Sequence, residues 1–452
     1  MKNLIYNLVI GIFFCQIAFS QENLPGKQEE IYLYFSFDKG VQPDYAISGV
    51  KNSQFSRNSI ATKKDGTDVS ENIPILEKGI SGKGIYLGNG VTNILLANQS
   101  DVEEGIDGFT SIGKAELIQS DTESWHNLAS LQVKTTKLLE SGFSVSAKVT
   151  GGKYQIVGPS TPTFVPNKYV FSIYLKGEGS LRIYLKDETN NITGKVENVI
   201  LTKDWKRYWC YIDLESSAEI TFYCLNAEGK QITFFADGLQ LEKKTPPGYY
   251  GADRTVIIPS PWTKGGSFRE PDTLIYPANL TDFPFEEGSL SFWFKPDYPV
   301  NDGEDHEFWQ FAWNYFACRK QLYSELLLWA GREEQDGKSG SASAVRVFTP
   351  EIGWIPETWH FVVGTWSNKE GLIALYLDGK QIGKAKGWRT KNIWFPENPY
   401  HGIGCSNVLN PAVKILRANA VLDDFTFWKK PLTCEEIKTI YENGKKKIEE
   451  VK

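Results

Sequence analysis

The chain has 452 residues, with 49 Lys and Arg against 55 Asp and Glu, and a formal net charge of −6. This mild negative charge argues against a nucleic-acid binder, which would carry a basic patch to meet phosphate. Aromatic residues make up 13% of the chain and glycine contributes 40 residues, a composition that disfavours helical bundles. The length is sufficient for several domains of roughly 100–200 residues each.

The first residues have the composition of a secretory signal peptide. One lysine precedes an apolar run over residues 4–19, and small residues at 18–20 suit a signal peptidase. The run is shorter than the roughly 20 apolar residues of a membrane span, and no later segment is long and apolar enough. Cys15 follows Phe14, where a lipoprotein signal needs a small residue. We therefore expect residues 1–20 to be a cleaved signal peptide, and a secreted or extracytoplasmic protein with no lipid anchor and no transmembrane segment.

Alternation of apolar and polar residues at every second position dominates the rest of the chain. Segments of this kind, separated by Gly, Asn, Asp or Pro, predict short strands at 31–37, 169–175, 181–185 and 372–377. Asp378 and Gly379, after the last of these, indicate a hairpin turn. Many short strands with little helix predict an all-β fold of two antiparallel jelly-roll β-sandwiches.

Helical periodicity is convincing only near the C-terminus, over residues 433–441. Thr433 is the expected N-cap, Glu436 its partner in a capping box, and Gly444 the expected stop. We expect a short C-terminal helix followed by a solvated charged tail at 445–452.

The cysteines are too few and too scattered for a disulfide framework or a zinc site. Cys210 and Cys224 flank a turn at 215–217 symmetrically. This arrangement fits a cross-strand disulfide and also fits two buried free thiols.

Several motifs resemble the strands of laminin-G-like, concanavalin A-like jelly rolls. The opening strands are IYLYFSFD at 31–38 and GISGKGIYL at 79–87. Four later motifs follow in the right order: GSLSFWFKP at 288–296, ETWHFVV at 357–363, the hairpin LYLDGK at 375–380, and the closing strand and helix at 422–437. The resemblance implies one sandwich that is discontinuous in sequence, with a first segment at 29–90 and a second at 251–444.

Residues 91–250, between these segments, resemble a carbohydrate-binding module of the family 4/9 type. The resemblance rests on an opening segment at 92–109, the motif WKRY at 205–208, and FADGLQLE at 235–242. It implies a second β-sandwich inserted into the first. It also implies a structural calcium ion held by Glu103 and Asp237, since carboxylate oxygens suit calcium. The alternative is that both carboxylates are merely solvated.

Sugar-binding modules of this kind stack pyranose faces on exposed aromatic rings. In the insert, Trp125 and His126 lie in the polar stretch 120–127, which is expected to be a loop. They either contact the ligand or pack within the loop. Weaker ligand candidates are Tyr154 and Trp209, whereas Trp205 and Tyr208 fall in the family's core motif and are expected to be structural.

The outer domain contains eleven of the 14 tryptophans. Trp309 and Trp313 share one face of the predicted strand at 308–315. This face either binds a sugar or is buried in the core. Trp388 and Trp394 flank a polar loop that begins with Arg389, and all three are candidate ligand contacts. We predict that these rings line one open groove if they bind a glycan.

No catalytic motif is recognisable. A jelly-roll hydrolase commonly presents its paired carboxylates as Glu-x-Asp-x-x-Glu on one strand, and the chain has no such run. Serine-hydrolase elbows, phosphate loops and HExxH are also absent from the sequence. The sequence therefore favours a secreted, non-catalytic polysaccharide-binding protein in glycan capture or cell-surface adhesion. The alternatives are a polysaccharide lyase or glycoside hydrolase with a site assembled from distant strands, and a protein–protein adhesion module.

Overall fold

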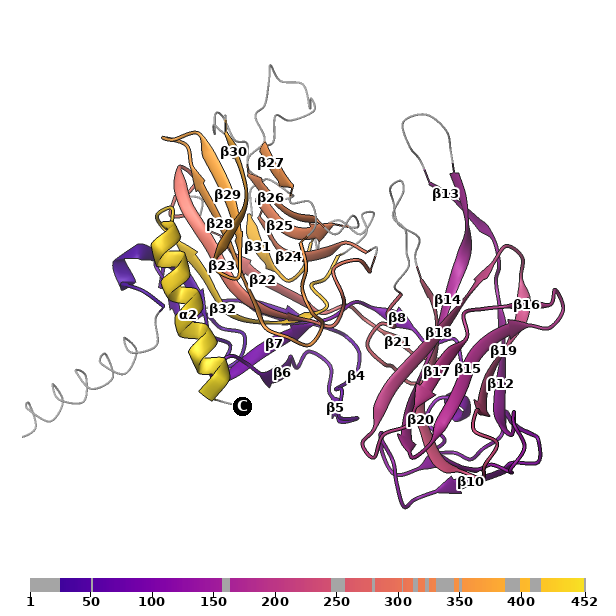
Figure 1. The fold of residues 1–452 in the computed structure, drawn as a ribbon. Coiled ribbons are helices and arrows are strands. Elements are labelled where there is room, and N and C mark those ends of the chain that lie inside the picture. Colours follow the sequence, from indigo (N-terminus) through magenta and orange to yellow (C-terminus); the bar gives the residue numbers. More distant parts are fainter. Residues whose placement is uncertain are drawn as a thin grey trace, which may run out of the picture.

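The computed structural model describes residues 25–49, 52–156, 163–244, 257–278, 281–302, 304–311, 316–321, 325–330, 345–348, 352–386, 399–406 and 416–450. The expected signal peptide at 1–20 lies outside these residues. The described chain forms two β-sandwiches side by side, each made of two antiparallel sheets (Figure 1). The expected all-β fold is confirmed. No helix in the described part is both long and apolar enough to cross a membrane.

The first sandwich combines strands from both ends of the chain. One of its sheets has the order β2-β1-β32-β23-β28-β29-β30, with β7 also paired to β32 and β6 paired to β7. Its strands are β1 (Ile31–Phe35), β2 (Tyr45–Ala46), β6 (Ile75–Lys78), β7 (Lys83–Leu87), β23 (Glu287–Pro296), β28 (His360–Ser367), β29 (Leu372–Leu377), β30 (Lys380–Lys386) and β32 (Ala420–Trp428). Antiparallel pairing of β1 with β32 joins the two distant segments in one sheet.

The facing sheet of the first sandwich has the order β27-β26-β25-β24-β31-β22-β3. Its strands are β3 (Gln54–Ser56), β22 (Thr273–Pro277), β24 (His306–Phe311), β25 (Phe316–Gln321), β26 (Glu325–Ala330), β27 (Val345–Phe348) and β31 (Tyr400–Ile403). The core between the two sheets is rich in aromatic rings, including Phe283, Trp309, Trp366 and Phe427. These rings account for much of the aromatic surplus of the chain.

The second sandwich is formed by residues 109–244. One sheet has the order β10-β11-β20-β14-β13 with β18 beside β14, and the other has the order β16-β15-β19-β12-β9 with β17 beside β15. Their strands are β9 (Phe109–Ile112), β10 (Glu116–Ser120), β11 (Ser130–Lys134), β12 (Gly142–Val149), β13 (Lys153–Ile156), β14 (Thr163–Gly177), β15 (Ser180–Asp187), β16 (Ile192–Thr193), β17 (Glu197–Ile200), β18 (Lys206–Leu214), β19 (Ala218–Asn226) and β20 (Thr233–Lys244).

Alternation along β15 gives the second sandwich its core. Leu181, Ile183 and Leu185 are buried, and the residues between them are partly exposed, as the period of two predicts. Cys210 and Cys224 lie on strands of opposite sheets, and both are buried free thiols. The structure therefore favours the free-thiol alternative over a disulfide.

Two short strand pairs and two single-turn helices complete the fold. The pairs are β4 (Ala61–Thr62) with β5 (Asp68–Val69), and β8 (Val91–Thr92) with β21 (Phe268–Arg269). The 3-10 helices are η1 (Gln28–Glu30) and η2 (Ala97–Gln99). Figure 1 shows β4, β5, β8 and β21 between the two sandwiches.

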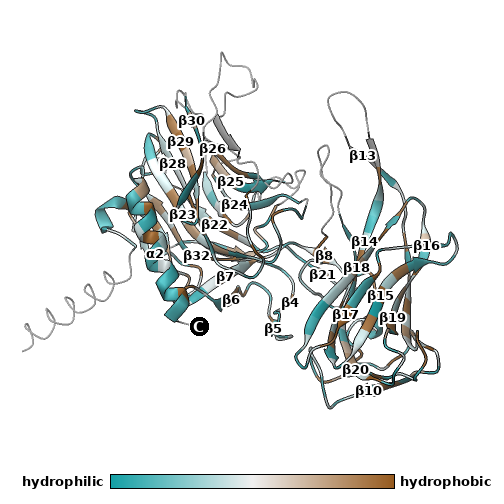
Figure 2. Ribbon diagram, in the orientation of Figure 1, coloured by the Kyte–Doolittle hydropathy of each residue, from teal (hydrophilic) through white to brown (hydrophobic). Residues whose placement is uncertain are grey.

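Helix α2 (Cys434–Glu450) packs on the outer face of the first sheet. It begins as predicted, because the carboxylate of Glu436 accepts a 2.8 Å hydrogen bond from the backbone N–H of Thr433. In Figure 2 the side of α2 that faces away from the sheet is coloured mainly as hydrophilic. The expected stop at Gly444 is wrong, since the helix continues to Glu450. Gly444 is required there because a Cβ atom would lie 2.3 Å from the Trp293 ring.

Candidate functional site

Strand β18 carries a row of large side chains on the face of its sheet that looks towards the first sandwich. Cys210 and Ile212 point into the core, so Arg207 and Trp209 lie on the opposite face by the period of two. Trp205, directly before the strand, lines the same cavity. All three are partly exposed. Tyr174, on β14, lies opposite Arg207 in the antiparallel ladder. A row of rings interrupted by one guanidinium therefore lines this side of the junction.

A cavity of about 420 Å³ lies between this face and the first sandwich. Its aromatic lining consists of Tyr86, Tyr174, Trp205, Trp209 and Trp262. A second cavity of about 330 Å³ continues along the second sandwich and shares Lys206, Arg207 and Trp209 with the first. We call the two cavities together the junction groove. Clefts of this size at domain interfaces are common ligand sites.

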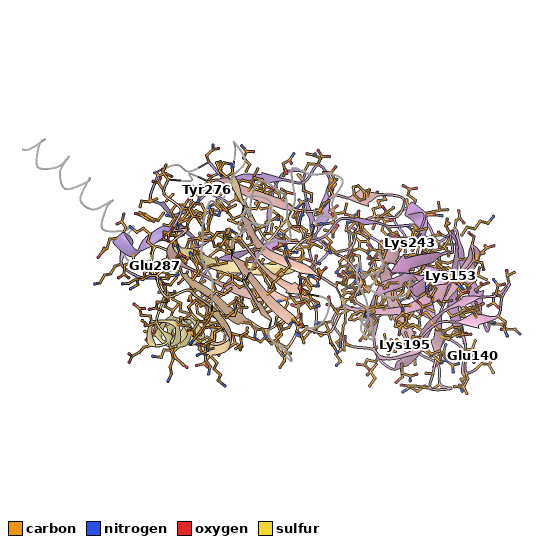
Figure 3. All side chains as sticks on the ribbon, turned by 90° about the horizontal axis from the view of Figure 1, so that it is seen from above. Glu140, Lys153, Lys195, Lys243, Tyr276 and Glu287 are labelled. Carbon is orange, nitrogen blue, oxygen red and sulfur yellow. The ribbon has the colours of Figure 1, made fainter. Side chains whose placement is uncertain are left out.

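Widely separated stretches of the chain contribute to the junction groove. The turn between β4 and β5 supplies Lys63 and Lys64, and strand β18 supplies Arg207. The loops next to β23 and β28 supply Asp297 and Glu357. Figure 3 views the molecule from above and labels Lys195, another lining residue, on the second sandwich. The site is therefore complete only when both sandwiches are in place.

Lys64 lies between two carboxylates on the first-sandwich side of the groove. Its Nζ atom is 2.6 Å from Asp297 Oδ1 and 2.6 Å from Glu357 Oε1. Burial lowers the pKa of Lys64, but the three neighbouring carboxylates outweigh it and raise the pKa overall. Burial and the charge of Asp297 raise the pKa of Glu357. Glu357 also has a φ of 61°, a left-handed conformation that is uncommon outside glycine.

Arg207 is held in place by neutral acceptors. Its Nη1 atom donates a 2.8 Å hydrogen bond to the Ser260 carbonyl oxygen, and its Nη2 atom donates one of 2.8 Å to Ser172 Oγ. The guanidinium lies 5.6 Å from the centre of the Tyr174 ring. Its Nε atom is buried and has no hydrogen-bond partner among the residues that the structure describes.

Trp125 and His126, both predicted as ligand contacts, instead connect the two sandwiches. Trp125 is 6% exposed and stacks on Tyr174 with ring centres 3.6 Å apart. Its Nε1 atom donates a 2.9 Å hydrogen bond to the Lys64 carbonyl oxygen. His126 is 3% exposed and contacts Asp68 at 3.2 Å. Burial leaves neither ring a face for a sugar, which corrects the expectation in favour of loop packing.

The predicted calcium ligands serve as anchors of the 122–129 loop. Asp237 Oδ2 accepts 2.9 Å hydrogen bonds from the backbone N–H groups of Trp125 and His126, and Oδ1 accepts one from Gly238. Burial raises the pKa of Asp237 to about 8, although these N–H donors act in the opposite direction.

Glu103 Oε1 accepts two further backbone N–H bonds, from Leu128 and Ala129. Within the described residues no group of three or more His, Cys, Asp or Glu is arranged to hold a metal ion. The N–H donors occupy Glu103 Oε1 and both oxygens of Asp237, which are the oxygens that a calcium ion would need, so this donor set fits calcium poorly.

Trp309 lies in the core of the first sandwich with 0% of its surface exposed. Its Nε1 atom donates a 3.2 Å hydrogen bond to His401 Nδ1, which is also buried. The sugar-binding alternative for Trp309 is corrected to buried core. The candidates Trp313, Trp388, Arg389 and Trp394 lie outside the described residues, as does the Tyr154 side chain.

Sequence reasoning missed most of the groove. The expectation that Trp205 is structural agrees with its packing against Trp125, Tyr174 and Trp262. Arg207, Trp262 and Tyr174 are not among the predicted ligand contacts. A signal for Arg207 is present, because the buried Cys210 and Ile212 define the core face of β18 and thus the outward position of residue 207. No local pattern indicates that Trp262 from another segment joins it.

Comparison with known proteins gives one family match. Residues 272–438 match the profile of the concanavalin A-like lectin/glucanases superfamily, of the laminin-G type. This segment is therefore a concanavalin A-like domain, as its motifs predicted. No curated protein matches the chain.

Several solved structures share limited similarity with the chain. The receptor-binding domain of botulinum neurotoxin mosaic serotype C/D is 17% identical over 38% of this chain and 40% of its own length, with a TM-score of 0.29. A SAP-like pentraxin from Limulus polyphemus is 16% identical over 35% and 70%, with a TM-score of 0.27. The CBM22-1 xylan-binding domain from Paenibacillus barcinonensis is 16% identical over 35% and 96%, with a TM-score of 0.25. The matched part thus spans less than half the length of the toxin domain.

Proposed function

We propose that the chain is a secreted, non-catalytic polysaccharide-binding protein that holds a glycan in the junction groove and acts in glycan capture or cell-surface adhesion. One observation carries the proposal: Trp209 on β18 and Trp205 directly before it stay partly exposed and line one cleft. Exposed rings of this size are an unfavourable apolar surface unless a ligand covers them. The apolar faces of sugar rings stack on indoles, and the polar groups of the groove are available to the hydroxyls.

The domain division belongs to the same proposal. We regard residues 29–90 and 251–444 as one laminin-G-like sandwich, and residues 91–250 as an inserted module of the carbohydrate-binding 4/9 type. Sheet membership supports this division, since the described strands from β9 to β20 pair only with one another. The first sandwich closes through β1 and β32 on either side of the insert.

A glycan array with the full chain tests the proposed binding. The double variant Trp205→Ala/Trp209→Ala is expected to lose most of the affinity for any glycan that the wild type binds. Tyr184→Ala is the matched control, because Tyr184 is a partly exposed ring on the opposite sheet of the same sandwich. Absence of binding to every glycan, or equal loss in both variants, would overturn the proposal.

A glycoside hydrolase is the second candidate, and the carboxylates around Lys64 favour it. Asp297 and Glu357 contact the same ammonium group, so they lie near the roughly 5 Å separation of retaining glycosidases. Binding without cleavage is the better supported function because Lys64 occupies the space between them, where a scissile bond would have to lie. A reducing-sugar assay on each bound glycan decides: turnover that Glu357→Gln abolishes would establish the hydrolase.

A further inference from the structure

We infer that the junction groove selects acidic glycans, in which carboxylate or sulfate groups are carried on the sugar chain. This inference rests on the proposed glycan-binding function and names its ligand class. It follows from how the charged side chains of the groove are paired, from the position of Arg207, and from the length of the aromatic row.

Each carboxylate that lines the groove contacts a lysine, and two of them, Asp297 and Glu357, share Lys64. Glu77 lies 3.4 Å from Lys295, and Glu197 lies 2.6 Å from Lys195. A groove whose acidic groups are already paired presents little negative charge to repel an anionic ligand.

Three cations of the groove make no ion pair within the described part of the chain: Lys63, Lys206 and Arg207. Lys206 is exposed and lies 5.4 Å from the Tyr208 ring centre, a contact that leaves its charge uncompensated. Uncompensated cations next to paired carboxylates give the groove a positive bias. An anionic group on the ligand would complete the pairing.

Arg207 is the most constrained of the three. Ser260 and Ser172 fix its guanidinium with hydrogen bonds to neutral oxygens, which orient the group without neutralising it. Each Nη group keeps a second N–H that makes no hydrogen bond within the described residues. A fixed guanidinium with these two donors suits a carboxylate or sulfate, because two N–H groups can form paired charge-assisted hydrogen bonds.

The strand geometry determines where the anionic group would lie on the ligand. Trp205 directly precedes β18 and Trp209 lies four residues later, which corresponds to about 13 Å if the chain is extended over these residues. One sugar ring is too small to cover both indoles, so the ligand is an oligosaccharide or a polymer. Arg207 is midway between them in the chain, and we place the acidic substituent on a sugar between the two stacked rings.

The test compares matched glycans on the full chain by isothermal titration calorimetry. One pair is a uronic-acid polysaccharide and its carboxyl-reduced form, and the other is a sulfated polysaccharide and its desulfated form. We expect at least about tenfold tighter binding to the acidic member of one pair, with affinity that falls as salt is raised. The pair that shows the difference identifies the anion as carboxylate or sulfate.

Arg207→Gln should remove that preference, and Arg207→Lys should restore part of it. Arg182→Gln is the control with the same change of charge, because Arg182 pairs with Glu140 on the opposite sheet. Lys206→Gln, at an exposed position, should weaken acidic binding even if Arg207→Gln fails to fold. Equal binding of acidic and neutral glycans, or an unchanged preference in both Arg207→Gln and Lys206→Gln, would overturn the inference and leave glycan binding intact. Binding of no glycan would overturn the proposed function itself.

Discussion

The indole N–H of Trp125, in a loop of the second sandwich, donates a 2.9 Å hydrogen bond to the main-chain carbonyl of Lys64, in the β4–β5 turn. The same indole stacks on Tyr174 and meets Trp262 edge-on at 5.3 Å. This bond fixes the turn that carries the Lys64 ammonium into the junction groove. A residue that resembles a sugar contact in sequence therefore acts as a positioning residue for the groove.

Replacing Trp125 by Phe should weaken both folding and glycan binding. The change removes the bond to Lys64 and part of the stacking on Tyr174, a loss of about 1–3 kcal/mol in the free energy of unfolding. Urea unfolding measures the first effect and titration with a glycan found on the array measures the second. Trp209→Ala is the comparison, since Trp209 is partly exposed and its removal should lower affinity with little change in stability. Full affinity in Trp125→Phe would contradict this role.

Gly66 offers a second test of the same connection. A Cβ atom at this position would lie 1.7 Å from the Trp125 carbonyl oxygen, and its φ is +86°. Gly66→Ala should therefore displace the turn and reduce the melting temperature and the glycan affinity together. Gly266→Ala is the matched control, because Gly266 has a φ of +72° with nothing within 4 Å of its Cβ position. Equal effects of both substitutions would mean that backbone strain at a positive φ explains the loss, and that the contact with Trp125 does not.

The elements that sequence patterns predicted best are those whose signals are local. The period of two along β15 and the capping box of Thr433 and Glu436 both depend on a few neighbouring residues, and both are present in the structure. The hairpin at Asp378 and Gly379 is another such case, with φ values of 50° and 76°. Local backbone geometry limits what these residues can do, so their pattern is informative.

The groove could not be predicted in this way because its partners are distant in sequence. Lys64, Arg207 and Glu357 come together only through the joining of two sandwiches, and no pattern within one segment indicates that contact. The burial of Trp309 could not be predicted either. The alternation along the strand places Trp309 on one strand face, but only the facing sheet determines whether that face is buried.

Metal removal tests the anchoring role of Asp237 and Glu103. Since their carboxylate oxygens accept N–H groups from the 122–129 loop, we expect equal melting temperatures with excess EDTA and with added calcium. Glu103→Gln keeps an oxygen acceptor and should cost little stability, whereas Glu103→Ala should cost about 1–3 kcal/mol by leaving two N–H groups unpaired. A calcium-dependent rise in melting temperature that Glu103→Gln removes would restore calcium at this position.

His401 should make stability depend on pH in the acid range. Its side chain is fully buried among Phe283, Phe311 and Phe427, and burial lowers its pKa from 6.5 to about 3. The unfolded chain takes up a proton below pH 6.5, but the folded chain does not, so stability falls as pH decreases from 6.5 towards 3. Each pH unit within that range should lower the free energy of unfolding by up to about 1.4 kcal/mol.

His401→Asn tests this assignment, because Asn offers an oxygen acceptor to the Trp309 indole and does not titrate. The variant should be less stable than the wild type near pH 7, since the smaller side chain leaves a cavity. Its urea midpoint should nevertheless change less steeply between pH 6.5 and 4, and the slope is the quantity to compare. An unchanged slope would show that the acid sensitivity comes from other groups, and that His401 titrates normally or not at all in both states.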